Sequence, residues 1–125
     1  MDKIKIFIVD DVEFIRRMLA NMISTEEDME LVGEEGTGQG SIFMLDEADP
    51  DVILLEAAIA GGMELTDVIK EIRNVSPKVK IVLVTDATSL DKVVAVTSEG
   101  IVDIISKPFK KEKVLRTIRE AMSED

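Results

Sequence analysis

Five polar residues follow short apolar runs of the sequence, and together they carry the side chains that phosphoryl chemistry needs. They are three carboxylates, one hydroxyl and one ammonium: Asp10, Asp11, Glu56, Thr85 and Lys107. Clustered carboxylates repel one another unless a cation lies among them, and hard oxygen ligands suit Mg²⁺. An ammonium and a hydroxyl can each hold an anionic oxygen. If the five side chains share one site, that site suits a divalent cation and a phosphoryl group.

The elements that must position these side chains can be read from the spacing of apolar residues. Short runs rich in Val and Ile predict strands at 4–9, 29–33, 52–55, 80–84 and 102–105. Apolar residues at helical spacing predict helices at 13–23, 41–48, 65–75, 90–99 and 114–122. The runs at 52–55 and 80–84 are apolar on both faces, which is typical of central strands in a parallel sheet. We interpret the Gly-rich stretch 36–40 as a flexible turn, because it lacks the spacing of a phosphate-binding loop.

This alternation predicts an α/β fold, a doubly wound (βα)5 sheet of five parallel strands with helices on both faces. The common solution is the flavodoxin-like strand order 2-1-3-4-5. In such sheets ligands bind beyond the carboxyl ends of the strands, at the switch point between the first and third. The five polar residues come from four such ends, so we expect them to converge there. Taken singly, each has a plainer interpretation, such as a helix cap for the acidic pair or a solvated loop residue for Lys107.

Composition narrows the function further. The chain has 125 residues, a length that suits a single domain over 1–125, and 46% hydrophobic residues supply its core. There is no Cys and no His, which excludes disulfides, thiolate chemistry and imidazole catalysis. The net charge of −11 argues against binding nucleic acid or an anionic membrane surface. No apolar stretch is long enough for a signal peptide or a membrane span, so we expect a cytoplasmic protein.

The chain resembles the receiver domain of bacterial two-component response regulators, the CheY-like family, over residues 3–122. The motifs that carry the resemblance are Val9-Asp10-Asp11, Asp51 to Leu55 before position 56, Thr85, and Ser106-Lys107-Pro108-Phe109. In this family the acidic pair binds Mg²⁺ and an Asp after the third strand accepts a phosphoryl group from a histidine kinase. The resemblance implies that Thr85 and Lys107 contact the phosphoryl oxygens, that the carbonyl of Ala58 is a further metal ligand, and that the Lys107–Pro108 bond is cis.

The sequence also departs from the family pattern. Glu56 stands where the family has its phospho-accepting Asp, and Ala60 replaces a Pro in the next loop. Asp86 takes the place of a small residue after Thr85, and Ile104 that of the aromatic switch residue. Glu56 is either an engineered imitation of a phosphorylated Asp or a natural change in a pseudo-receiver. Because the departures extend beyond position 56, we favour natural divergence.

We therefore expect a receiver module that acts through protein–protein contacts, is not an enzyme, is not phosphorylated at Glu56 and binds Mg²⁺ weakly. The alternatives are a working Mg²⁺-dependent phospho-receiver and, from another class, a small carboxylate and metal phosphohydrolase. A hydrolase would ideally have Asp-x-Asp, and position 12 is Val. We expect a histidine kinase or downstream target to bind the face formed by the fourth helix, fifth strand and fifth helix, with the chain a monomer or weak homodimer. The residues we expect to offer there are Lys92, Val96, Glu99, Lys111, Lys113 and Arg116.

Overall fold

The computed structural model describes residues 2–59, 62–96 and 100–123. Within them, five parallel strands form one sheet in the order β2-β1-β3-β4-β5, as the sequence predicts. The strands are β1 (Ile4–Val9), β2 (Met29–Glu35), β3 (Val52–Glu56), β4 (Lys80–Thr85) and β5 (Ile101–Ser106). Every residue of β3 is buried, which fits its central place and its apolar sequence.

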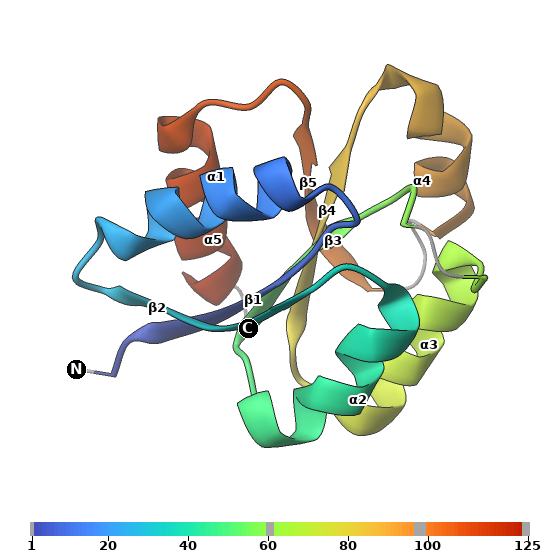
Figure 1. Ribbon diagram of the computed structural model, residues 1–125, viewed down its shortest axis with the longest axis horizontal. Coiled ribbons are helices and arrows are strands. Elements are labelled where there is room, and N and C mark those ends of the chain that lie inside the picture. The colour runs from blue at the N-terminus through green and yellow to red at the C-terminus, as the bar shows by residue number, and fades with distance from the viewer. Residues whose placement is uncertain (1, 60–61, 97–99, 124–125) are drawn as a thin grey trace.

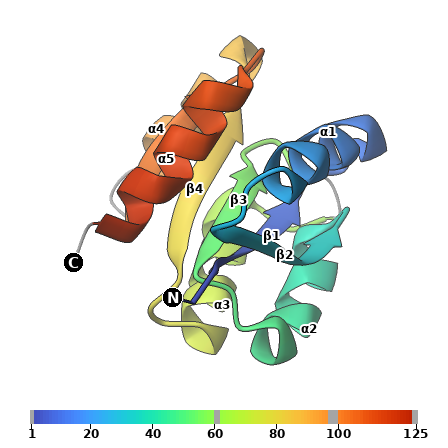
Figure 2. The same ribbon diagram turned by 90° about the vertical axis from the view of Figure 1, so that its left-hand side faces the viewer.

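Helices cover both faces of the sheet (Figure 1 and Figure 2). They are α1 (Glu13–Ser24), α2 (Gly38–Ala48), α3 (Leu65–Val75), α4 (Leu90–Val96) and α5 (Lys111–Ser123). A short 3₁₀ turn, Ala87–Ser89, leads into α4. Helices α1 and α5 lie on one face, whereas α2, α3 and α4 lie on the other. None of the helices in the described part of the chain is long and apolar enough to cross a bilayer.

Alternate residues of each central strand enter two separate apolar clusters, one on each face of the sheet. Phe7 and Ile53 pack with α3 residues such as Ile69. Their sequence neighbours Ile8 and Leu54 belong to the other cluster, with α1 and α5. This period-2 division follows from strand geometry. Because all neighbouring strands of the sheet run parallel, their carboxyl ends meet along one edge.

The stretch 36–40 differs from our expectation of a flexible turn. Residues from Gly38 onward form the first turn of α2, so the helix begins before residue 41. The side chain of Thr37 caps this helix by accepting a hydrogen bond of 2.9 Å from the backbone N–H of Gly40. The glycine at position 38 is explained by packing, because a Cβ there would lie 2.7 Å from Cγ2 of Val68 in α3.

Candidate functional site

The carboxyl ends of the strands bring the predicted polar residues to one edge of the sheet. Asp10 follows β1, and Glu56 is the last residue of β3. Val9 pairs with Leu55, so the residues that follow them, Asp10 and Glu56, come from adjacent strands. Thr85 ends β4, and its carbonyl accepts a hydrogen bond of 2.7 Å from the backbone N–H of Lys107 after β5.

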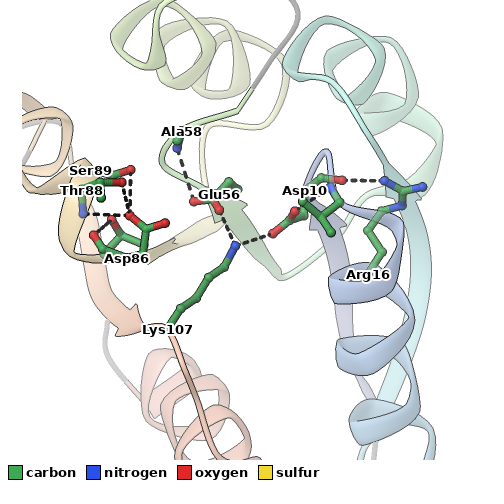
Figure 3. Close-up of polar contacts among 10 residues, drawn as sticks. Asp10, Arg16, Glu56, Ala58, Asp86, Thr88, Ser89 and Lys107 are labelled. Atoms are coloured by element: carbon green, nitrogen blue, oxygen red, sulfur yellow. Dashed lines mark hydrogen bonds and ion pairs between the residues drawn. The ribbon is translucent and has the colours of Figure 1, made fainter.

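Lys107 lies between the two buried carboxylates (Figure 3). Its Nζ donates to Oδ2 of Asp10 at 3.3 Å and to Oε1 of Glu56 in a shorter contact. The side chains of Asp10 and Glu56 are 1% and 6% exposed, and that of Lys107 is 17% exposed. The structure thus contains one ammonium held by two carboxylates in a site largely shielded from water.

Backbone groups bind the remaining oxygens of the same two carboxylates. The N–H of Val12 donates to Oδ1 of Asp10 at 2.9 Å, and the N–H of Ala58 donates to Oε2 of Glu56 at 3.3 Å. Each of the four carboxylate oxygens therefore has a donor. Such a set of contacts opposes displacement of Glu56, because moving its carboxylate would leave buried donors without an acceptor.

The charge of Lys107 is stabilised by this arrangement. Burial by itself lowers the pKa of a lysine, because it disfavours the charged form. Here the hydrogen bond and the negative charge of Glu56, together with those of Asp10, outweigh burial and hold the pKa of Lys107 above its ordinary value. Lys107 is accordingly a permanent cation at neutral pH.

Thr85 and Asp86 follow one another at the end of β4, and their side chains make different contacts. Thr85 is buried at the site, and its hydroxyl donates to the backbone carbonyl of Asp86 at 3.1 Å. The carboxylate of Asp86 turns to the start of the 3₁₀ turn, where Oδ1 accepts from the N–H and hydroxyl of Thr88. These two hydrogen bonds, with a smaller effect of the positive charge on Lys107, lower the pKa of Asp86. Asp86 is thus a capping residue near the site.

The oxygen atoms around Lys107 are the right type for Mg²⁺, but their arrangement fits the ion poorly. Among the described residues, no three Asp or Glu side chains lie close enough together to hold a metal ion. Asp10 and Glu56 share their charge with Lys107, while Asp11 is exposed. A divalent ion bound by Asp10, Asp11, Glu56 and the carbonyl of Ala58 would require Lys107 to withdraw and Asp11 to turn inward.

Arg16 is a site neighbour that the sequence interpretation missed. From α1, its Nη1 donates to the backbone carbonyl of Asp10 at 2.6 Å (Figure 3). Its Nε also pairs with Glu34 of β2 at 3.3 Å. Arg16 therefore fixes the backbone at the end of β1. The available signal was its position on the first helix, less than two turns after the acidic pair.

The predicted partner face needs one correction. Val96 is fully buried in the cluster under α4, because it shares the inward side of the helix with Val93 three residues earlier. Val94 is the exposed valine of this helix, at 72%. Lys92, Lys111 and Arg116 are exposed, Lys113 is half-buried, and Glu99 lies outside the described residues. Ile104 packs against the core on the same side as Val93.

The Lys107–Pro108 peptide bond is cis, as the resemblance implies.

Comparison with known proteins gives consistent matches along the chain. The model of the response regulator receiver domain matches residues 6–119. The chemotaxis protein CheY of Listeria monocytogenes is 29% identical over 118 residues, which cover 94% of this chain and 98% of that protein. The transcriptional regulatory protein LiaR of Bacillus subtilis is 31% identical, and the match covers 94% of this chain but 56% of LiaR.

Solved structures of similar fold also superpose on this chain. The response regulator domain of Thermotoga maritima CheB superposes with a TM-score of 0.82 at 25% identity, covering 98% of both chains. The receiver domain of AraT from Geobacillus stearothermophilus gives a TM-score of 0.85 at 19% identity, covering 95% of this chain and 92% of that one. This second likeness concerns the fold.

Proposed function

The chain belongs to the response regulator receiver family, and from that premise we propose that it is a pseudo-receiver, a signalling module that takes no phosphoryl group at Glu56. In this proposal its acidic pocket is held in one state by the Lys107 ion pairs, and the domain acts by binding other proteins rather than by catalysis. The comparisons give no support to the phosphohydrolase alternative.

The observation that carries the proposal is the ammonium between Asp10 and Glu56. Phosphoryl transfer to a carboxylate needs an oxygen aligned with the donor, and positive charge on the transferred group. Both oxygens of Glu56 already accept hydrogen bonds, from Lys107 and from the N–H of Ala58. The positive charge that would meet an incoming phosphoryl group is paired with carboxylates inside the protein.

The length of Glu56 adds a second obstacle. Its side chain has one methylene more than Asp, which displaces the oxygen from the position that the family's acceptor takes. A displacement of about 1 Å can slow a positioned reaction by about a hundredfold. Oε1 of Glu56 accepts a hydrogen bond from Lys107. In this proposal Glu56 therefore supplies a built-in anion where a receiver would gain one by phosphorylation.

The test is the intact mass of the chain after incubation with acetyl phosphate and Mg²⁺. We expect no adduct on the unchanged chain. A stable gain of one phosphoryl group that disappears in Glu56→Gln would refute the pseudo-receiver proposal in favour of a working phospho-receiver. Glu56→Asp is the matched variant: labelling of it would show that position 56 alone blocks the reaction, whereas continued silence would implicate the following loop as well.

For a signalling partner we propose the face of α4, β5 and α5. Lys92, Lys111 and Arg116 supply exposed positive charge there beside the exposed carboxylates of Asp91 and Glu112, and Val94 adds an exposed aliphatic side chain. A mixed-charge surface of this kind favours a specific partner of complementary charge. Since Ile104 has no hydroxyl to reposition, we propose that this face is fixed rather than switched. Charge reversal at Lys111 and Arg116 should weaken binding of such a partner, and unchanged affinity would contradict the assignment.

A further inference from the structure

Helix α2 has apolar residues on its outer side as well as on the side that packs on the sheet. Ser41 and Leu45 are buried beneath it, as expected for a helix on a sheet. Phe43 points the other way and is 92% exposed, the highest value among the large apolar side chains that the structure describes. Met44 beside it is 39% exposed. Exposed single apolar residues are common, but a Phe with almost no cover is a large uncompensated apolar surface.

Phe43 stands between two shallow hollows of the surface. One lies between α2 and α3, which run side by side in Figure 1, and the other lies between α2 and the edge strand β2. Apolar side chains line both hollows. In the first they are Ile42, Phe43 and Met63, and in the second they are Leu31, Val32, Phe43, Met44 and Ala48. Both hollows are lined by Phe43, so together they form one surface with apolar side chains at its centre, which we call the Phe43 surface.

The charged groups around the Phe43 surface are mainly acidic. Four carboxylates and one ammonium line the two hollows: Glu30, Glu47, Asp67, Glu71 and Lys70. An acidic rim around an apolar centre repels nucleic acid and anionic lipid. It also disfavours a second copy of this chain, because two such rims would face each other and each chain carries a net charge of −11. The rim complements a partner with positive charge beside apolar side chains.

The helix that presents Phe43 is held firmly at its start. Gly38 packs closely under Val68 of α3, and the side chain of Thr37 caps the first turn. The hydroxyl of Ser41 also donates to the carbonyl of Gly38 at 2.6 Å. A surface fixed in this way needs little ordering when it binds, which lowers the entropic cost of association.

We propose that the Phe43 surface is a docking site for a protein segment whose apolar side chains are flanked by Lys or Arg. Phe43 is its anchor, and the two hollows receive apolar side chains of the partner. The surface is separate from the acidic pocket and from the α4, β5 and α5 face, so it binds a partner whether or not Glu56 accepts phosphate. Aromatic anchors at the centre of a contact often carry most of its binding energy.

The test uses a defined probe, a short amphipathic peptide of Leu and Lys, titrated into the ¹⁵N-labelled full chain. We expect chemical-shift changes concentrated at residues 30–32, 39–48 and 67–71, which line the two hollows. Binding should weaken as NaCl rises from about 0.05 M to about 0.5 M. A peptide with Glu in place of every Lys should not bind. Phe43→Ala should raise the dissociation constant about tenfold or more. Because Phe43 is nearly uncovered, this variant should fold and melt as the unchanged chain does.

Phe14→Ala is the matched control, since Phe14 is also an exposed Phe, at 69%, but lies on α1. It should leave the affinity for the Leu/Lys peptide unchanged. Equal affinity of Phe43→Ala and the unchanged chain, or shifts spread over the whole acidic surface, would overturn the proposal by showing charge attraction alone. The second measurement is the oligomeric state of the chain without peptide, determined by analytical ultracentrifugation. A dimer that Phe43→Ala abolishes would overturn the proposal in favour of a second copy as the occupant.

Discussion

Replacing Lys107 by alanine removes the ammonium between the carboxylates of Asp10 and Glu56. At the 3.3 Å separation from Asp10, Coulomb's law with an effective dielectric constant of about 20 gives an attraction of about 5 kcal/mol. Removing these charges from water in the native state offsets much of that attraction. The variant, however, keeps two buried carboxylates with no cation, and breaking a buried pair in this way costs about 3–5 kcal/mol. Since Lys107 is partly exposed, we expect the free energy of unfolding to fall by about 3 kcal/mol.

Urea denaturation at neutral pH measures this loss. If the dependence of the unfolding free energy on urea concentration is the same for both chains, the unfolded state is unchanged by the substitution. Lys111→Ala is the matched control. Lys111 also pairs with a carboxylate, Glu26, at 3.9 Å, but its side chain is 44% exposed. Removing such a surface pair should cost less than about 1 kcal/mol. If Lys107→Ala costs no more than Lys111→Ala, the reasoning is wrong, and the two carboxylates do not depend on the ammonium.

Three further outcomes follow from the geometry. The pKa of Lys107 is raised above its ordinary value of 10.5, so its stabilising contribution is fully present below that pH and is lost as pH rises through the raised pKa. The difference in unfolding free energy between the unchanged chain and Lys107→Ala should therefore be constant from neutral pH to about pH 10 and should decrease above it. Gly38→Ala should lower the free energy of unfolding by about 1–3 kcal/mol, measured in urea, because the new Cβ overpacks against Val68. Mg²⁺ titrated into the labelled chain should bind weakly at the carboxyl ends of the strands, because Lys107 already occupies the carboxylates, and more weakly still in Asp11→Ala. Unchanged affinity in that variant, or no binding at all, would contradict our expectation of a weak Mg²⁺ site that includes Asp11.

Strand order and the convergence of Asp10, Glu56 and Lys107 could be predicted from the sequence, because both depend on the backbone. Alternating strands and helices require a parallel sheet, and the carboxyl ends of parallel strands share one edge. Any residue that directly follows such a strand must lie at that edge, whatever its side chain does. The surrounding helices then follow from the 3.6-residue spacing of their apolar residues.

The contacts that distinguish this pocket depend on side-chain conformation, and the sequence alone does not determine them. The carboxylate of Asp86 could have faced the pocket, but it accepts hydrogen bonds from the N–H and hydroxyl of Thr88 and so caps the 3₁₀ turn Ala87–Ser89 instead. The outward position of Val94 and the burial of Val96 could have been predicted, since Val93 and Val96 are spaced for one helix side. Phe43 could not be placed in this way, because the apolar residues of α2 occupy both its inner and its outer sides.

The separation of the apolar clusters by the sheet has a consequence for how such a chain evolves. Phe7 and Ile8 are neighbours in sequence, yet each packs in a different cluster. Substitutions that share no partners usually have additive effects on stability, whereas those in contact depend on each other. A lineage can therefore repack the side under α3 while the side under α5 stays ancestral. In descendants of this chain, substitutions of Phe7 should be compensated within its own cluster, for example at Ile69, more often than at its sequence neighbour Ile8 in the other cluster.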